Sequence, residues 1–221
     1  MPIGIQTFDK IRADSYVYID KTALVYELVQ TKTPYFLARP RRFGKSLLIS
    51  TLKAYFEGRK ELFTGLKIAE LEKEWIPYPV IHIDFGRNGY ETNAQLKIRL
   101  NKILTEYETL YGITKDTDDE PTRLETLLQR VNKQTGKQVV VLVDEYDNPL
   151  ITSENLTESK KIYRGFFSVL KAADKYIKFA FITGVTKFAK TSIFSGTNQP
   201  EDITDDENFS AICGNLVATL V

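Results

Sequence analysis

The sequence predicts an α/β fold in which helices cover both faces of a central parallel sheet. Two observations carry this prediction. Short apolar runs alternate along the chain with longer segments of helical periodicity. One short run, 139–143, is an uninterrupted Val-Val-Val-Leu-Val, which is typical of a strand buried on both faces. Such strands occur where helices lie on either side of a parallel sheet.

Four strands are expected. The first covers 35–38 and follows Pro34, which has no N–H to donate and therefore suits the start of a strand. The second covers 80–85, a β-rich run between a proline and a glycine. The apolar run 139–143 is the third, and the buried segment 178–183 is the fourth. No repeat or Pro/Gly/Ser-rich linker divides the chain, so we expect a single domain.

Helices are expected between these strands. Segment 45–56 is apolar around most of its circumference, which predicts a buried helix. Segment 92–111 carries Leu, Ile and Tyr at helical spacing. A helix over 122–134 would end at Gly136, a residue suited to a C-terminal cap. A further helix is expected over 160–174.

Composition excludes several kinds of chemistry. The 221 residues carry 30 basic and 29 acidic side chains, so net charge gives no argument for a nucleic-acid or membrane partner. The single cysteine, Cys213, excludes an intrachain disulfide, and the single histidine, His82, excludes two-histidine metal sites. No apolar run approaches the ~18 residues that a membrane helix needs. These features are typical of a reduced, cytoplasmic, globular protein.

A candidate phosphate-binding loop, Arg39-Pro40-Arg41-Arg42-Phe43-Gly44-Lys45-Ser46, follows the first expected strand and opens the buried helix. In this setting, backbone N–H groups and the helix dipole attract phosphate. Lys45 would reach the β- and γ-phosphates of ATP, and the Ser46 hydroxyl would bind Mg²⁺. The residues expected to contact the nucleotide are Arg41, Arg42, Phe43, Gly44, Lys45, Ser46 and Leu47.

The loop departs from the G-x-x-x-x-G-K-[ST] pattern at Arg39, where the pattern has its first glycine. Arginine does not adopt a positive φ without a steric cost. We therefore expect the loop to close differently, with the guanidinium group of Arg41 or Arg42 assisting.

A second motif places two carboxylates, Asp144 and Glu145, directly after the apolar strand 139–143, the Walker B pattern. Asp144 would hold Mg²⁺ through water, and Glu145 would polarise the attacking water. Ligands of open α/β sheets bind at the carboxyl ends of the strands, so Asp144 and Lys45 would face one crevice. The alternative is that 144–149 forms a solvated turn, but the order of the two motifs favours the functional interpretation.

A third element is Thr183, at the end of the fourth strand and before Gly184. P-loop ATPases with an additional strand between the loop strand and the Walker B strand place a polar sensor here. Thr183 would hydrogen-bond the γ-phosphate or the lytic water. A strand-terminal threonine before a turn glycine explains the same residues equally well.

Other polar residues have simpler explanations. His82 lies in mid-strand and is expected in the core or a groove, whereas Asp84, at the end of that strand, would point into the crevice of Asp144. The acidic pair at 201–202 is expected in a solvated loop. Aromatic residues do not interleave with a basic patch, so nucleic-acid binding is unsupported by this chain.

The sequence resembles the AAA-ATPase-like family of divergent bacterial P-loop ATPase domains. The resemblance rests on Pro2-Ile3-Gly4-Ile5-Gln6-x-Phe8, Tyr18-Ile19-Asp20-Lys21-Thr22, Arg39-Pro40-Arg41-Arg42-Phe43-Gly44-Lys45-Ser46-Leu47, Phe63-x-Gly65-Leu66, Val143-Asp144-Glu145-Tyr146-Asp147 and Thr183-Gly184-Val185-Thr186-Lys187-Phe188. It implies that Arg39 is a family trait, that 18–22 flanks the adenine, and that Lys45, Ser46, Asp144 and Glu145 are nucleotide, metal and catalytic positions.

The resemblance also implies a domain organisation. It predicts a P-loop three-layer sandwich over 1–214, with 1–33 as a flanking segment and an expected strand order of 5-1-4-3-2. In the family, a helical lid and a nuclease-like domain follow; here 215–221 is expected as a short tail without either.

Three functional hypotheses follow. The first is Mg²⁺-dependent ATP binding with slow hydrolysis. The second is a non-hydrolysing, nucleotide-gated module for a protein partner or for self-association. The third is the ATPase part of a nucleic-acid processing or defence system.

Overall fold

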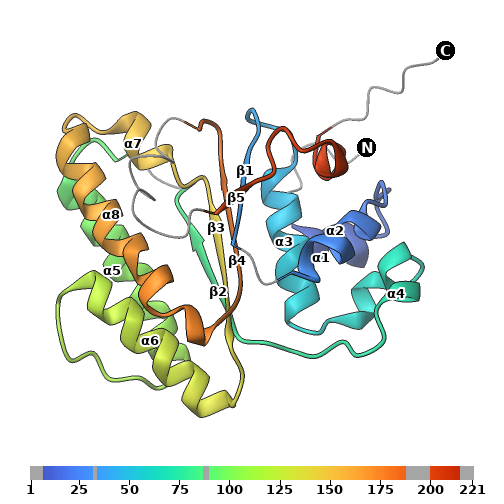
Figure 1. Ribbon diagram of the computed structural model, residues 1–221, viewed down its shortest axis with the longest axis horizontal. Coiled ribbons are helices and arrows are strands. Elements are labelled where there is room, and N and C mark those ends of the chain that lie inside the picture. The colour runs from blue at the N-terminus through green and yellow to red at the C-terminus, as the bar shows by residue number, and fades with distance from the viewer. Residues whose placement is uncertain (1–6, 32–33, 87–89, 188–199, 215–221) are drawn as a thin grey trace.

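The computed structural model describes residues 7–31, 34–86, 90–187 and 200–214, which form a three-layer α/β arrangement (Figure 1). The central sheet of this described part is five-stranded and parallel throughout. Its strands are β1 (Tyr35–Ala38), β2 (Val80–Asp84), β3 (Val139–Asp144), β4 (Ile177–Gly184) and β5 (Glu201–Asp202). Their spatial order is β2-β3-β4-β1-β5, which reads 5-1-4-3-2 from the β5 edge. The predicted α/β class with a parallel sheet is confirmed.

Helices cover both faces of the sheet (Figure 1). One face carries α5 (Asn93–Leu110), α6 (Glu120–Thr135), α7 (Asn148–Thr152) and α8 (Leu156–Ala172). The other carries α1 (Phe8–Ala13), α2 (Thr22–Val29), α3 (Lys45–Phe56) and α4 (Lys67–Leu71). Short 3₁₀ turns, η1 (Lys60–Phe63), η2 (Asp174–Tyr176) and η3 (Glu207–Phe209), complete the described elements.

Strand β3 shows why a continuous apolar run was needed. All its residues are buried, and alternate side chains enter opposite layers. Val139, Val141 and Val143 join the hydrophobic cluster under α5, α6 and α8, whereas Val140 and Leu142 join the cluster under α2 and α3. A polar residue at any of these positions would therefore be buried in one of the two hydrophobic layers.

Most expected elements are confirmed within a few residues, and the departures have local causes. Helix α6 begins earlier than expected because the Asp119 carboxylate caps it by accepting the Thr122 N–H, and Pro121 suits the first turn. It ends as expected at Gly136, with φ of 66°. The expectation of a solvated loop at 201–202 is wrong. These two residues pair with β1 as the edge strand β5, and two adjacent acidic residues give no sign of a strand in the sequence.

The sheet ends at β2 because side chains of α5 occupy its open edge. The Tyr107 hydroxyl accepts the His82 N–H (2.6 Å) and donates to the His82 carbonyl (3.2 Å). Arg99 donates to the Asp84 carbonyl through Nη2 (2.7 Å) and Nε (3.2 Å). These bonds satisfy outward-facing backbone groups that would otherwise accept another strand. They also hold the carboxyl end of β2 in place.

Helices α5 and α6 are joined by a buried ion pair. Arg123 is 1% exposed and donates to both oxygens of the Glu108 carboxylate, through Nε (2.9 Å) and Nη2 (2.7 Å). The same guanidinium also donates to Asn101 and Thr105. A buried charge needs such complete pairing, because an unpaired one carries a large desolvation penalty.

Candidate functional site

The loop between β1 and α3 closes without a glycine at position 39. Arg39 does not have a positive φ; the left-handed conformations of the loop lie at Arg42 (φ 69°) and Gly44 (φ 81°). The Arg39 guanidinium donates to the carbonyls of Thr204 and Ala38. Arg39 therefore anchors the loop to the segment after β5, and the steric cost of a positive φ falls on Arg42 instead of on Arg39.

Lys45 is the first residue of α3 and is 5% exposed. Its ammonium group turns back into the loop, where Nζ donates to the carbonyls of Arg39 (2.9 Å) and Pro40 (3.0 Å). A positive charge is thus held inside the loop at the N-terminus of a twelve-residue helix. Both features attract an anion such as phosphate.

Asp144, the last residue of β3, is 4% exposed and has a fixed orientation. Its Oδ1 accepts the Thr183 hydroxyl (2.5 Å) and the N–H of Glu145 (3.0 Å). Thr183 is fully buried at the end of β4, so its hydroxyl holds the Asp144 carboxylate from the neighbouring strand.

Glu145 follows at a sharp backbone turn with a φ of 51°, a conformation that costs a non-glycine residue about 1–3 kcal/mol. This turn takes its side chain out of the core, where it is half-buried. Burial raises the pKa of the Glu145 carboxyl, and the neighbouring Asp144 carboxylate raises it further; Lys45 and Arg41 act in the opposite direction. A carboxylate of raised pKa is a stronger base, which suits proton abstraction near neutral pH.

A polar cavity of about 370 Å³ brings three site residues together: Ser46, Asp144 and Glu145. Asp84 lines the same cavity, in register with Asp144 on the adjacent strand, as its position at the end of β2 suggested. His82 also lines it and is half-buried. The cavity is completed by Thr7, Asp9, Ser50, Lys53, Ala54, Glu57 and Gly86.

The segment after β3 is not a solvated turn. Asp147 is 1% exposed and its carboxylate accepts the N–H groups of Val185 (3.0 and 3.1 Å) and Thr186 (2.7 Å), and the Thr186 hydroxyl (2.9 Å). The Tyr146 hydroxyl donates to the Thr186 carbonyl (3.0 Å). The ends of β3 and β4 are therefore locked together. Sequence reasoning missed Asp147, and its only signal was its place in the Val143–Asp147 motif.

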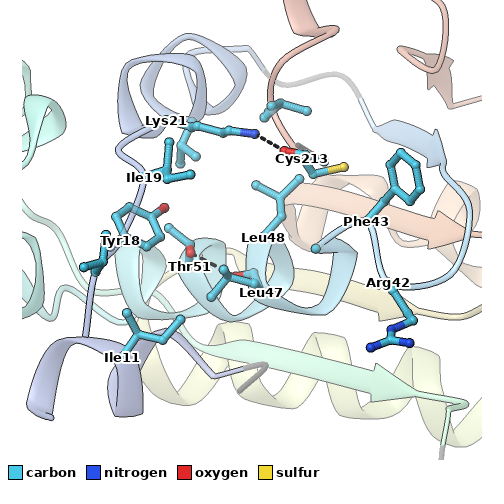
Figure 2. Close-up of a pocket in the computed structure, with 15 residues that line it drawn as sticks. Ile11, Tyr18, Ile19, Lys21, Arg42, Phe43, Leu47, Leu48, Thr51 and Cys213 are labelled. Atoms are coloured by element: carbon cyan, nitrogen blue, oxygen red, sulfur yellow. Dashed lines mark hydrogen bonds between the residues drawn. The ribbon is translucent and has the colours of Figure 1, made fainter. Parts of the chain in front are cut away.

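A second cavity, of about 280 Å³, lies beside the loop and is mainly apolar (Figure 2). Tyr18, Ile19 and Lys21 line it from the segment before α2, and Phe43, Leu47 and Leu48 line it from the loop and α3. The remaining lining residues are Ile11, Val17, Val25, Arg42, Gly44, Thr51, Ile212, Cys213 and Gly214.

Polar groups at the wall of this cavity are tied to the protein. Lys21 Nζ donates to the Gly214 carbonyl (2.6 Å), and burial lowers the pKa of Lys21 (Figure 2). Burial raises the pKa of Tyr18 to about 12, with the Asp20 carboxylate adding to the shift and a hydrogen bond with Thr51 opposing it. Burial likewise raises the pKa of Cys213, so its thiol stays protonated near neutral pH. The walls are thus uncharged apart from Lys21 and Arg42.

The donors that face the polar cavity fit a hydrated magnesium ion. Within the described residues, no group of three or more His, Cys, Asp or Glu side chains could hold a metal by itself. Mg²⁺ needs no such group, because it keeps several waters and takes one or two protein oxygens beside those of a phosphate. The Ser46 hydroxyl and the Asp144 carboxylate are oxygen donors of this kind.

The helix-flanked parallel sheet, with a lysine-bearing loop at a helix N-terminus beside an acidic strand end, is consistent with a P-loop-like class of protein. The chain belongs to the family described as "Predicted AAA-ATPase", which it matches over residues 2–194. This membership implies nucleotide binding and possible ATPase activity. Residues 2–6 and 188 of the family motifs, and the expected tail 215–221, lie outside the described residues.

The chain is also similar to a protein of Azotobacter chroococcum mcd 1 named "Uncharacterized protein in vnfD 5'region". The two are 41% identical, and the match covers 97% of this chain and 42% of the relative. The chain therefore spans less than half of that relative's length.

No helix in the described ranges is both long and apolar enough to cross a membrane.

Proposed function

We propose that this domain binds ATP with Mg²⁺ and hydrolyses it slowly. The observation that carries the proposal is the meeting of Ser46, Asp144 and Glu145 in one cavity, at the helix N-terminus where Lys45 is buried. The strand order, 5-1-4-3-2 from the β5 edge, supports the P-loop class that has an additional strand between the loop strand and the Walker B strand.

The phosphates occupy the loop from Arg41 to Ser46, where N–H groups of the α3 N-terminus and the Lys45 ammonium face them. Bound Mg²⁺ would supply Lewis-acid stabilisation of the charge that develops on the phosphate oxygens. Ser46, through its hydroxyl, and Asp144, through water, would hold this ion. Thr183 orients the Asp144 carboxylate through its hydrogen bond. Direct contact between Thr183 and the γ-phosphate stays a prediction.

Glu145 acts on the attacking water. As the water oxygen forms a bond to the γ-phosphorus, the bond from that phosphorus to the bridging oxygen breaks, and its electron pair leaves with ADP. The Glu145 carboxylate accepts the proton that the water loses and later returns it to solvent. Burial raises the pKa of this carboxyl, which favours proton uptake.

The apolar cavity of Figure 2 accommodates the base. It adjoins Phe43, Gly44 and Leu47, so a nucleotide with its phosphates on the loop would place its base there. Its residues at 18–21 are those that the family resemblance puts beside the adenine. None of the lining residues is an aspartate or glutamate, so the cavity offers no carboxylate to the donor edge of guanine. We therefore favour adenine over guanine.

The binding part of the proposal is tested by titrating the protein with a fluorescent ATP analogue, with and without Mg²⁺, beside Lys45→Ala. Saturable, Mg²⁺-dependent binding that the variant loses supports the phosphate loop. Lack of binding in both proteins, at concentrations up to the millimolar range, would refute it.

The hydrolytic part is tested by phosphate release from Mg²⁺–ATP in wild type and Glu145→Gln. We expect the variant to lose turnover and to bind nucleotide with unchanged affinity, because Gln keeps the shape of Glu but is not a base. Unchanged turnover would remove Glu145 from the mechanism.

A nucleotide-gated module without hydrolysis is the second candidate. It is favoured by the hydrogen bonds between Lys45 and the carbonyls of Arg39 and Pro40, which phosphate would have to displace. The loop would then differ between free and bound states, and a protein partner or a second copy could read that difference. Saturable binding without any turnover would favour this candidate. Turnover that DNA stimulates would instead favour a role in nucleic-acid processing or defence.

A further inference from the structure

The end of strand β2 brings a carboxylate, Asp84, next to the proposed catalytic base. Asp84 pairs in register with Asp144 and lines the polar cavity with Ser46, Asp144 and Glu145. The Arg99 guanidinium bonds the Asp84 carbonyl, so the backbone from which this side chain projects is held in place. Asp84 is half-buried, which leaves part of its surface toward the cavity.

Gly86 sets the spacing between Asp84 and Glu145. Its N–H donates to Asp84 Oδ1 (2.7 Å). A Cβ atom added at Gly86 would lie 3.1 Å from Asp84 Oδ1 and 3.1 Å from Glu145 Oε2. Because both atoms lie 3.1 Å from that Cβ position, Asp84 Oδ1 and Glu145 Oε2 are at most about 6 Å apart. Any larger residue here would press on both carboxylates, and glycine lets them approach each other from adjacent strands.

We propose that Asp84 and Glu145 bind the attacking water between them, each accepting one of its two hydrogens. This inference rests on the ATP hydrolysis proposed above. A water molecule donates two hydrogen bonds, and ionised carboxylates act only as acceptors. A single acceptor would leave the water free to rotate about one hydrogen bond. The second acceptor fixes its lone pair toward the γ-phosphorus, and such orientation lowers the barrier to reaction.

The roles of the two carboxylates differ during the step. Glu145 takes the proton that the water loses as its oxygen bonds to the γ-phosphorus and the bond to the ADP oxygen breaks. The other hydrogen of the water, which Asp84 accepts as a hydrogen bond, stays on the attacking oxygen and leaves with inorganic phosphate. Asp84 is therefore a catalytic residue that touches the reacting water without accepting its proton.

Two other acidic residues line the same cavity and serve as comparisons. Glu57 pairs with Lys53 at 2.9 Å, one turn away on α3, and Asp9 pairs with Arg59. The three atoms nearest to a Cβ at Gly86 belong to Asp84 and Glu145. Glu57→Gln therefore removes one negative charge from the same cavity without touching the bound water, which makes it a matched control.

The test measures phosphate release at saturating Mg²⁺–ATP, affinity for the fluorescent ATP analogue, and melting temperature. Asp84→Leu keeps the branched shape of the side chain and removes both acceptor oxygens. We expect the turnover of this variant to fall by at least about tenfold, because a misplaced reactant slows a reaction by this much or more. Nucleotide affinity should stay within about threefold of wild type on the same argument. Glu57→Gln should keep turnover within about twofold.

Gly86→Ala gives an independent test that changes no charge. Its methyl group would displace the two carboxylates by a few tenths of an ångström, and we expect a loss of turnover with retained nucleotide affinity. Since Gly86 does not need a positive φ, the alanine adds no backbone strain. Together the two variants separate loss of the acceptor from loss of its position.

The outcomes distinguish this inference from the proposed function. Wild-type protein that binds ATP but never releases phosphate would overturn the hydrolysis and, with it, the role of Asp84. Wild-type turnover that Asp84→Leu leaves unchanged would overturn the role of Asp84 alone. Equal losses of affinity and turnover, or an equal loss in Glu57→Gln, would assign Asp84 to nucleotide binding or to general electrostatics and would also overturn it.

Discussion

The end of β4 packs so closely against the segment after β3 that position 184 accepts only glycine. A Cβ atom added at Gly184 would lie 2.5 Å from Tyr146 Cδ1 and 2.9 Å from Asp147 Oδ1. Contacts between carbon atoms are normally about 3.5–4.0 Å, so the Tyr146 ring would have to move by about 1 Å. That ring is fully buried and packs edge-on against Phe36, with 5.3 Å between ring centroids.

We predict that Gly184→Ala destabilises the domain by about 2–3 kcal/mol, the upper part of the range for overpacked cores, because the obstructing atoms belong to a fixed ring and a hydrogen-bonded carboxylate. For a chain of this length, each kcal/mol lowers the melting temperature by roughly 2–4 °C. The expected decrease is therefore about 4–12 °C. Turnover should fall as well, since Thr183 precedes this glycine and holds Asp144.

The assay is thermal unfolding followed by circular dichroism, with urea unfolding as a second measure. Gly165→Ala is the matched control. Gly165 lies inside α8, where an added Cβ has its nearest neighbour, Pro121 Cγ, at 3.7 Å. Alanine favours a helix interior by about 0.5–1 kcal/mol over glycine, so the control should melt at the same or a higher temperature. Unchanged stability in Gly184→Ala, or an equal loss in both variants, would refute the packing argument.

Three further predictions concern polar groups that folding removes wholly or partly from water. Thr183→Val keeps the side-chain shape but removes the hydrogen bond to Asp144. We expect the free energy of unfolding in urea to fall by about 1–3 kcal/mol and the Mg²⁺ dependence of nucleotide binding to weaken. No change in either quantity would contradict the role given to Thr183. Because folding raises the pKa of Glu145, ionisation of its carboxyl destabilises the folded state as pH rises above the ordinary carboxyl range. Glu145→Gln should therefore be no more stable than wild type in acid but increasingly more stable toward pH 8. A difference in melting temperature that does not depend on pH would contradict this. Arg123→Met should cost about 3–5 kcal/mol because it leaves Glu108 buried and unpaired, and Met at both positions should restore most of that loss in the same unfolding assay.

Local patterns in the sequence were sufficient for most of the fold. The apolar run of β3 and the helical spacing in α5 each reflect one segment packing on a layer, so their periodicity is visible without the rest of the chain. The short elements α1, α4, α7 and β5 were missed because they have few residues in which a period could show. Strand β5 in particular depends on β1, which lies far away in the sequence.

The candidate site was predicted only in part, because contiguous motifs are visible in the sequence and partners far apart in the chain are not. The loop around Lys45 and the carboxylates at 144–145 are contiguous motifs with a direct chemical interpretation. Asp147 carries no such pattern, because its partners lie 38 and 39 residues farther along the chain. Arg39 appeared to be a steric problem, and its solution depends on the carbonyl of Thr204, which no local rule connects to it.

The sequence by itself determined the α/β class, the order of strands and helices along the chain, and the residue types that can bind phosphate and magnesium. These follow from short-range periodicity and from functional groups that neighbour each other in the chain. Only the tertiary structure decided that Thr183 holds Asp144, that Gly86 brings Asp84 to Glu145, and that the segment around Tyr18 forms a cavity with the phosphate loop. The physical reason is that a hydrogen bond or a close approach depends on distance in space, and folding brings together residues whose separation in the chain carries no information about that distance.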